Sequence, residues 1–488
     1  MKTFNLNETI LNLPAENTLW TIGDAVEGVQ IFGGIGSGKT SGSGRTLALK
    51  YLDAGFGGLV LTVKPDEKAF WEGYAAMTGR TNDLIIVEPR GENFFNFLHY
   101  ISEGDGNTEN IVDVLKTVIR ASEEKAGKSD DAFWESALDM LMFNVIDLCK
   151  LAYGQVSIKR MFDIVQTLPK PDVADEEKTS PFYEAFLLAQ ETVMAKVSDW
   201  ENAQSPNALM KLKSRADYDD VLCDAIADAR ILRFLDQFFL DSLLHLSDKT
   251  RSIIDFSFSG FLFRLLREPV YSLFCNSVSN FTPEQCSDGK IIIIHLPVKL
   301  YHKIGRDSQI MFKYIWQRAM EKRSIDENSR PVFLWADEAQ NFLHEHDAEY
   351  QATARSSKIA TVYISQNLPN YYANMGGAKS EFRVKSFLGT LNTKVFHANA
   401  DIETNRYASE LIGDAAFEET SQTATAAGHF SSSKTKSLKY DRLVRAEAFQ
   451  SLKTGGKQNA HLTECYMLSQ KRSGKAHIKI EFNQNFTV

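Results

Sequence analysis

The chain has 488 residues, of which 43% are hydrophobic and 24% charged, a composition typical of a folded globular protein with two or three domains. Its formal net charge of −9 argues against wholesale coating of nucleic acid. The charge is uneven, because the segment from residue 431 onward carries eleven Lys and Arg against four Asp and Glu. Five scattered cysteines without a C-x-x-C pair indicate reduced thiols in a cytosol.

Neither a secretion signal nor a membrane span is predicted. The N-terminus lacks a charged region followed by an apolar stretch, so we expect no signal peptide. The most apolar segment, 138–153, is interrupted by Asp139, Asp147 and Lys150 and is shorter than the ~20 apolar residues that a span requires. We therefore expect a soluble, cytoplasmic protein without an integral membrane segment.

The first motif along the chain, Gly33–Thr40, fits the Walker A pattern G-x-x-x-x-G-K-[ST]. Its glycines let backbone N–H groups turn toward phosphate oxygens, while Lys39 reaches the β- and γ-phosphates and Thr40 offers a hydroxyl to Mg²⁺. A strand is predicted before it, at 28–32, and a helix after it, at 46–52, so the anion lies at a helix N-terminus. We predict an ATP and Mg²⁺ site in which these residues bind nucleotide: Gly33, Gly34, Gly36, Ser37, Gly38, Lys39, Thr40 and Ser41.

Two further strands, at 58–63 and 84–88, are predicted with a short helix between them. Strands that alternate with helices over short connections predict a parallel α/β sheet. Because ligands of such sheets lie at the carboxyl ends of the strands, Lys64 and Asp66 are expected near the phosphates. An exposed turn with solvated charges is an equal alternative for these two residues.

From about residue 105 to residue 283 the pattern is almost wholly helical, with apolar residues spaced by three and four. Helices are predicted at 110–120, 133–153, 182–196, 227–246 and 253–274. The pattern predicts an all-α domain inserted between two strands of the sheet. Its aromatic residues are expected in the core and not in a ligand site. They are Phe133, Trp134, Phe234, Phe238, Phe239, Phe256 and Phe258.

The sheet resumes with predicted strands at 290–297, 331–336, 359–364 and 392–398, and with a helix at 307–323 after the first of them. A polar Ser/Thr/Lys stretch between residues 418 and 439 is predicted to be a flexible loop. The expected fold is α/β with a mostly parallel central sheet and an inserted all-α domain. We divide it into 1–104, the first part of the nucleotide-binding domain, 105–283, the all-α insertion, and 284–488, the second part with the basic C-terminal region.

The residues that complete the Walker A site are predicted at the ends of other strands. Asp337 and Glu338 close an apolar strand, so Asp337 is expected to hold Mg²⁺ and Glu338 to polarise the water that attacks the γ-phosphate. Gln366 follows the strand expected between the two Walker strands, where its amide can sense the γ-phosphate or merely cap the next turn. Arg355 is our candidate for an arginine that reaches the γ-phosphate of a neighbouring subunit, with an ordinary surface arginine as the alternative.

Other P-loop classes lack support in the sequence. The segment 392–395 lacks the Asp with which GTPases recognise guanine, and no ABC-type L-S-G-G-Q segment occurs. A small-molecule kinase would not need a glutamate after its Walker B aspartate. The combined set of Lys39, Asp337, Glu338, Arg355 and Gln366 predicts an ATPase motor.

The order of motifs resembles the type IV coupling protein family, the VirD4/TraD/TraG-like conjugative DNA-transfer ATPases, over almost the whole chain. Walker motifs occur in many motors, but a P-loop followed by an all-α insertion, Asp-Glu-x-Gln and Ser-Gln is more specific. The segments that carry the resemblance are Gly36–Thr40, Phe95–Leu98, Phe133-Trp134, Trp335–Gln340, Ile364–Asn367, Thr393–Phe396 and Ile412-Gly413.

This resemblance implies a homo-hexameric ring of RecA-like P-loop domains of the ASCE class, which hydrolyses ATP at subunit interfaces and moves DNA, single- or double-stranded, through a central channel. It also implies a relaxase or a type IV secretion component as a partner. Two departures are present. Typical members carry transmembrane helices before the P-loop, so we expect any attachment to the inner membrane to be peripheral, through a partner. Phe97 stands where the family usually has Pro, and Val63–Glu67 matches the family's second-strand motif loosely.

Three functions are compatible with these motifs. The first is a DNA translocase like the conjugative coupling proteins. The second is a motor of the same architecture that remodels or moves protein, or acts in mobile-element defence. The third is a non-motor scaffold that binds ATP with little turnover. Stimulation of ATP hydrolysis by DNA distinguishes the first from the others.

Overall fold

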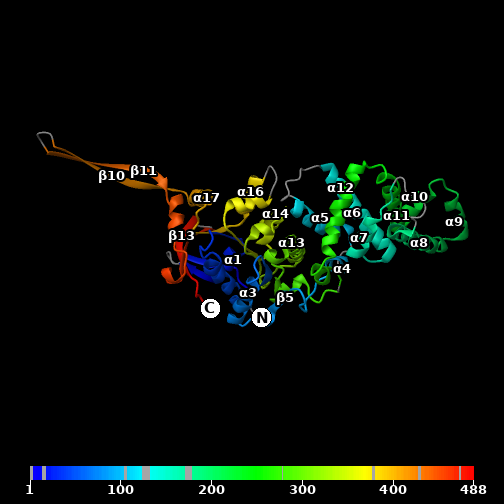
Figure 1. Cartoon of the computed structure of the whole chain (residues 1–488), viewed down its shortest axis with the longest axis horizontal. Helices are drawn as coiled ribbons and strands as arrows, with labels where there is room; N and C mark the ends of the chain where they lie inside the picture. Colours follow the sequence, from blue (N-terminus) through cyan, green and yellow to red (C-terminus); the bar gives the residue numbers. More distant parts are fainter. Residues whose placement is uncertain are drawn as a thin grey trace. The chain divides into compact units, whose positions relative to one another are not determined.

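The structure, a computed structural model, describes residues 4–13, 18–103, 107–123, 132–170, 179–276, 278–375, 380–426, 430–471 and 474–488. The chain forms two compact units (Figure 1). The first comprises Met1–Ile86, Pro283–Leu300 and Trp316–Val488 and holds the central sheet; the second comprises Val87–Thr282 and Tyr301–Ile315 and is built of helices. The three-part division drawn from the sequence stays a prediction.

A nine-stranded sheet forms the centre of the first unit, in the order β13-β12-β9-β3-β8-β7-β4-β6-β5. The pairings from β9 through β3, β8, β7 and β4 to β6 are parallel, whereas β12 is antiparallel to both β9 and β13. The predicted α/β fold with a mostly parallel sheet is therefore confirmed. The strands are β3 (Val29–Phe32), β4 (Gly57–Leu61), β5 (Leu84–Val87), β6 (Ile291–Ile294), β7 (Val332–Ala336), β8 (Ile359–Ser365), β9 (Thr393–His397), β12 (Leu462–Lys471) and β13 (Gly474–Asn483).

The inner strands are apolar because helices cover the sheet. Every residue of β6, β7 and β8 is buried, as expected for parallel strands enclosed on both faces. Helix α3 (Glu67–Met77) is fastened to β7 by Trp71, whose ring stacks on Phe333 at 5.4 Å between centroids and meets Trp335 edge-on at 5.3 Å. This packing fixes the start of α3 close to the end of β7.

Strand β8 lies between β3 and β7, as predicted from the sequence. Ile31 of β3 pairs with Ile364, and Trp335 of β7 pairs with Val362. Because the three strands are parallel, the loops that follow them emerge at one edge of the sheet. The P-loop, the Asp337-Glu338 pair and Gln366 therefore all lie at this edge.

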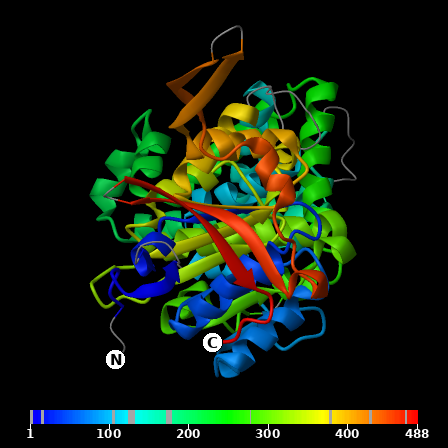
Figure 2. The same cartoon turned by 90° about the vertical axis from the view of Figure 1, so that its left-hand side faces the viewer.

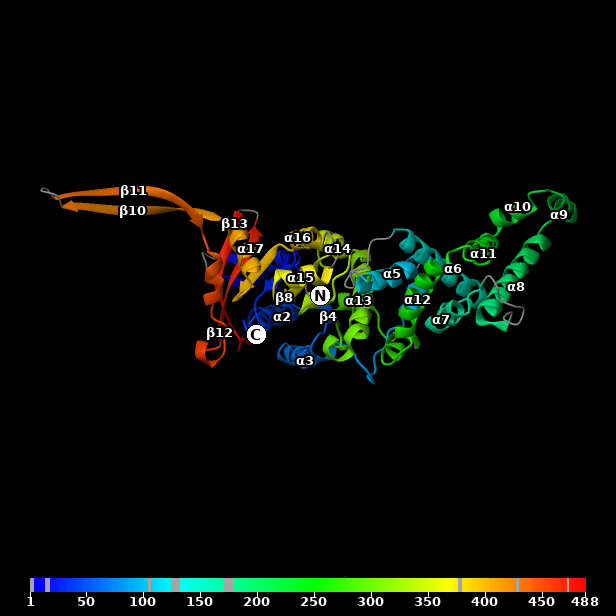
Figure 3. The same ribbon diagram turned by 45° about the horizontal axis from the view of Figure 1, so that its top comes forward.

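The second unit contains the predicted helices, and α6, α8 and α11 pack side by side in it (Figure 3). The predicted helix at 253–274 is shorter, since it ends at Leu265 ahead of Pro269, which cannot continue a helix. Its main helices are α5 (Thr108–Glu123), α6 (Ala132–Tyr153), α7 (Ile158–Gln166), α8 (Pro181–Asn202), α11 (Ala227–Gln237) and α12 (Asp248–Leu265).

The expected aromatic core of this unit is only partly correct. Phe238, Phe239 and Phe258 are buried, but the prediction is wrong for Phe234 and Phe256, which are 57% and 79% exposed. Residues two positions apart on a helix face different sides, so Phe256 turns outward where Phe258 turns inward. The side chains of two further residues of the prediction, at positions 133 and 134, lie outside the described part of the structure.

The apolar segment 138–153 forms most of α6, and its charged residues have partners within the unit. Lys116 of α5 forms an ion pair with Asp139. Lys150 donates to the Thr108 hydroxyl at 2.9 Å. Within the described ranges, no helix combines the length and the apolar character needed to cross a bilayer.

The prediction of a flexible loop between 418 and 439 is wrong. The segment forms a hairpin of β10 (Asp414–Ala426) and β11 (Phe430–Arg442), paired in uninterrupted antiparallel register, which extends away from the rest of its unit (Figures 1 and 3). Its Ser and Thr residues suggested a loop by composition, yet Thr favours strands. The described side chains at 416–421 and 434–440 are exposed, so the strands carry no apolar periodicity that could have marked them. Also not predicted were the β1 (Thr9–Leu13) and β2 (Thr18–Thr21) pair and the antiparallel strands β12 and β13, which lie at the near edge of the sheet in Figure 2.

Gly58 tests the register of the sheet, since it is paired with Phe333 across β4 and β7. A Cβ at Gly58 would lie 2.5 Å from the Phe333 ring, so we expect Gly58→Ala to lower the free energy of unfolding by ~1–3 kcal/mol. Gly73→Ala in α3 is the matched control: an added Cβ meets nothing within 4 Å, and Ala should stabilise the helix by up to ~1 kcal/mol. Urea denaturation measures both. If Gly58→Ala is as stable as the wild type, the pairing of β4 with β7 in this register is contradicted.

Candidate functional site

The P-loop connects β3 to a helical segment that begins with a π-helical turn, Thr40–Gly44, and continues as α2 (Arg45–Asp53). Gly36 and Gly38 have φ of 72° and 83°, in the left-handed region that favours glycine. The Ser37 hydroxyl is buried and has no hydrogen-bond partner among the described residues. A loop with an unused buried donor and a helix N-terminus behind it fits a phosphate group.

Thr40 and Asp337 are in direct contact, although they are 297 positions apart: Thr40 Oγ1 donates to Asp337 Oδ2 at 2.8 Å. Lys64 Nζ lies 3.5 Å from the same oxygen, while Asp337 Oδ1 accepts from the backbone N–H of Glu338 at 2.9 Å. Burial lowers the pKa of Lys64, but the charges of Asp337, Glu67 and Glu338 outweigh burial and raise it. The hydroxyl and the carboxylate form an arrangement that fits Mg²⁺, which prefers oxygen ligands.

Glu338 lies beside this pair in a left-handed backbone conformation, with φ of 52°. Its Oε1 accepts from Gln366 Nε2 at 3.2 Å and lies 3.9 Å from Lys39 Nζ, and its Oε2 accepts from Gln340 Nε2 at 2.9 Å. The Gln340 Oε1 in turn accepts from the Ser365 hydroxyl at 2.9 Å. The ends of β3, β7 and β8 thus bring Lys39, Glu338 and Gln366 together, and Gln340 is a contact that sequence reasoning missed.

These residues surround a cleft of ≈ 670 Å³, which Lys64 and Asp66 also line. Of the eight residues predicted to bind nucleotide, six line the cleft: Gly36, Ser37, Gly38, Lys39, Thr40 and Ser41. Gly33 and Gly34 lie beneath it, where their N–H groups donate to Ser365 O at 3.3 Å and Ala398 O at 2.8 Å. A Cβ at Gly33 would lie 2.4 Å from Ser37 Oγ, so this glycine lets the loop fold back on itself.

Arg355 is not part of this cleft. It follows α14 (Asp347–Ala354) and precedes β8, at the opposite edge of the sheet from the P-loop. Its guanidinium is 3.1 Å from Glu27 Oε1, and its side chain is 57% exposed. Within one chain the arginine therefore cannot reach the P-loop, and its action on a neighbouring subunit stays a prediction.

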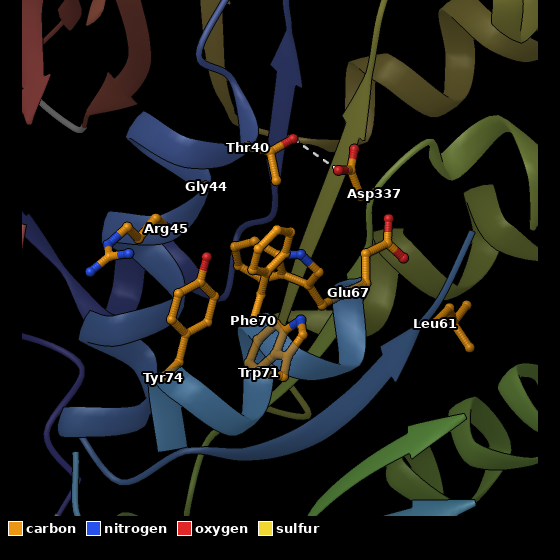
Figure 4. Close-up of a pocket in the computed structure, with 10 residues that line it drawn as sticks. Thr40, Gly44, Arg45, Leu61, Glu67, Phe70, Trp71, Tyr74 and Asp337 are labelled. Atoms are coloured by element: carbon orange, nitrogen blue, oxygen red, sulfur yellow. Dashed lines mark hydrogen bonds between the residues drawn. The ribbon is translucent and has the colours of Figure 1, made fainter. Parts of the chain in front are cut away.

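A second cavity adjoins the cleft, and sequence reasoning missed most of its lining. Figure 4 shows Glu67, Phe70, Trp71 and Tyr74 of α3 facing Thr40 and Asp337 across it. Burial raises the pKa of the Glu67 carboxyl to about 8, and the charge of Asp337 acts in the same direction. A short helix was predicted between the strands at 58–63 and 84–88, but the closeness of α3 to Asp337 depends on how α3 packs against β7.

His397 is hydrogen-bonded to the helical segment that follows the P-loop. Its Nδ1 is 3.1 Å from Glu464 O, which can only accept, so Nδ1 carries the proton and Nε2 accepts from the Ser43 hydroxyl at 2.7 Å. Burial lowers the pKa of His397 to about 3, and the charge of Lys39 adds to the effect. The imidazole is therefore neutral at physiological pH and holds the helix that begins at Thr40.

Comparison with known proteins shows which class of protein this chain is similar to. A family model described as "TraM recognition site of TraD and TraG" matches residues 331–454. No curated protein sequence matches the chain.

Among solved structures, the unbound form of the bacterial conjugative coupling protein TrwBdeltaN70 covers 100% of this chain and 91% of its own, with a TM-score of 0.60 and 15% identity. TrwB in complex with a non-hydrolysable ATP analogue covers 100% and 92% (TM-score 0.60, 13% identity). TrwB with ADP and Mg²⁺ covers 100% and 91% (TM-score 0.60, 13% identity). The chain thus has the RecA-like P-loop fold. The predicted resemblance to the type IV coupling protein family is confirmed, by sequence over 331–454 and by fold over the whole chain.

The neutral state of His397 predicts how stability depends on pH. The folded pKa lies below the usual 6.5, so below pH 6.5 the unfolded chain binds a proton that the folded chain refuses. We expect the wild type to lose stability as pH falls from 6.5 toward 3. His397→Gln should flatten this loss by up to ~1.4 kcal/mol per pH unit. The control is His346→Gln, on a half-exposed imidazole. Parallel pH profiles for His397→Gln and wild type in chemical denaturation would contradict a buried neutral imidazole.

Proposed function

We propose that the chain is an ATP-driven DNA translocase of the type IV coupling protein kind, which hydrolyses ATP in the P-loop cleft and works as a homo-hexameric ring. The observation that carries the proposal is the 2.8 Å hydrogen bond from Thr40 to Asp337, with Lys39 and Glu338 beside it. This pairing of a P-loop hydroxyl with a strand-end carboxylate is what a Mg²⁺-dependent phosphoryl-transfer site needs.

The proposed roles follow from position. Gly36–Lys39 hold the phosphates, Thr40 and Asp337 hold Mg²⁺, and Glu338 orients the attacking water. Bound Mg²⁺ neutralises the phosphate charge and polarises the γ-phosphoryl group. Gln366, within 3.2 Å of Glu338, is placed to sense whether the γ-phosphate is present.

The contacts of Glu338 suggest how the site is held inactive before ATP binds. Both carboxylate oxygens are engaged, Oε1 by Gln366 with Lys39 nearby and Oε2 by Gln340. A triphosphate is a stronger anionic partner for Lys39 and Gln366 than one carboxylate is. Once these two side chains turn to the phosphates, Oε1 becomes free to accept a proton from water.

DNA is the proposed cargo because the family segment and the fold are those of conjugative coupling proteins. A ring that grips DNA through its backbone phosphates binds without sequence preference and weakens steeply with salt. A relaxase or a type IV secretion component is the proposed further partner. TrwB itself is described as a conjugative coupling protein that binds nucleotide analogues.

The test is the ATPase rate of the assembled protein with and without single- and double-stranded DNA. We expect DNA to stimulate the wild type, and the stimulation to fall with increasing salt. Glu338→Gln should bind ATP but turn it over ~10²–10⁴ times more slowly, because an amide cannot accept the proton of water. ATP hydrolysis that ignores both kinds of DNA would contradict the translocase and favour a protein-remodelling motor. Absence of hydrolysis at any condition would favour a scaffold.

Arg355 is the proposed arginine that completes the neighbouring site of the ring. Arg355→Ala should leave ATP binding unchanged and lower turnover by ~10³-fold or more. Glu27→Gln is the matched control, since it removes the 3.1 Å ion pair of Arg355 and keeps the guanidinium. Rings that mix Arg355→Ala with Glu338→Gln subunits should recover hydrolysis at interfaces that hold one intact residue of each kind. Wild-type turnover by Arg355→Ala alone would show it to be a surface arginine.

A further inference from the structure

Glu67 is a buried carboxylate next to the proposed magnesium site. It is the first residue of α3 and is 6% exposed. Its Oε2 accepts from the backbone N–H of Val63 at 2.7 Å. Its Oε1 is buried and has no hydrogen-bond partner in the part of the chain that the structure describes. An unpartnered carboxyl oxygen is costly to bury, so this position needs an explanation outside the protein's own hydrogen bonds. Burial alone favours the protonated carboxyl, whereas a cation beside it would favour the ionised form, whose oxygens accept.

Two cations that line the same cleft as Glu67 make their hydrogen bonds to other groups. Lys64 Nζ is directed to Asp337 Oδ2 at 3.5 Å. Arg45 Nε donates to Phe486 O at 3.1 Å, and its NH2 group to the sulfur of Met77 at 3.7 Å. In Figure 4 the Glu67 carboxylate is directed toward that of Asp337, and both line the cavity that also contains Thr40. The Glu67 carboxyl group thus borders the cavity in which Thr40 and Asp337 would hold a cation.

The ligands that Mg²⁺ prefers indicate which hydrogen-bond donor could reach Glu67 Oε1. Mg²⁺ demands six oxygen ligands and keeps several waters, using one or two carboxylates together with phosphates. Among the described residues, no group of three or more His, Cys, Asp or Glu side chains is placed to hold a metal ion directly. Waters therefore fill the positions that Thr40, Asp337 and the phosphates leave open, and each of these waters has protons that need an acceptor.

We propose that Glu67 is a positioning residue of the magnesium site: its Oε1 accepts a hydrogen bond from a water molecule bound to Mg²⁺, while Thr40 and Asp337 hold the ion itself. The proposal rests on the nucleotide site proposed above and adds a carboxylate to it. Fixing a metal-bound water fixes the orientation of the ion, as outer hydrogen bonds do at other metal sites. Helix α3 thereby couples the end of β4 to the metal.

The test is the Mg²⁺ dependence of nucleotide binding by Glu67→Gln in the full-length protein. Glutamine keeps an oxygen for the Val63 N–H, so the turn should survive, but its other atom donates and repels the protons of a bound water. A fluorescent ATP analogue is titrated at increasing Mg²⁺. We expect the apparent Mg²⁺ affinity to fall ~10- to 100-fold with Mg²⁺-free nucleotide binding unchanged. Glu72→Gln, on the same helix with its side chain 44% exposed, is the control and should match the wild type.

An unchanged Mg²⁺ titration by folded Glu67→Gln would overturn the proposal. Should that variant not fold, a structure of the wild type with Mg²⁺ and ADP decides: the proposal requires a metal-bound water within ~3.2 Å of Glu67 Oε1. An Oε1 bonded to a protein group instead would overturn it. If the wild type binds nucleotide neither in EDTA nor in Mg²⁺, the proposed function is contradicted. If both proteins bind nucleotide and Glu67→Gln has the Mg²⁺ dependence of the wild type, only the role of Glu67 is contradicted.

Discussion

The hydrogen bond between Thr40 and Asp337 is the interaction on which the rest of the site depends. It joins residues 297 positions apart and exists only if β3 and β7 are parallel, with one strand between them. β8 is that strand, and its own end contributes Gln366. The sheet order thus determines which side chains meet, and the same constraint keeps Arg355 at the opposite edge. In the proposed ring, that edge of one subunit would lie beside the P-loop edge of the next.

The C-terminal part of the chain packs against the P-loop, a contact that no sequence motif predicts. A Cβ at Gly38 or Gly42 would lie 2.2 Å from the side chain of Thr463 in β12. Gln484 Nε2 donates to the Ser41 hydroxyl at 2.7 Å. These contacts explain why glycines continue past the P-loop into the first turn of the helix: an antiparallel strand lies directly against it. The same strand presents the Glu464 carbonyl that accepts from His397 Nδ1.

Much of the site could be predicted from sequence because its parts are local patterns. An apolar strand with a glycine-rich loop, or one with Asp-Glu at its end, specifies both the element and the edge at which the polar residues emerge. Glu67 and His397 could not be found in this way, since their roles depend on tertiary contacts between α3 and β7 and between β9 and the P-loop helix. The hairpin of β10 and β11 was missed for a related reason, because Ser/Thr-rich composition resembles that of a loop until the pairing register is known.

The central claim is that the meeting of these strand ends forms an ATP site. Equilibrium binding of a fluorescent ATP analogue to the wild type and to Lys39→Ala, with the two matched in thermal stability, tests it most directly. Lys39 is the cation nearest to Glu338, at 3.9 Å, and lines the cleft with the loop glycines. The account predicts saturable binding by the wild type and a loss of affinity of at least ~10-fold in Lys39→Ala, which corresponds to ~1.4 kcal/mol. Equal affinity of the two proteins would contradict it.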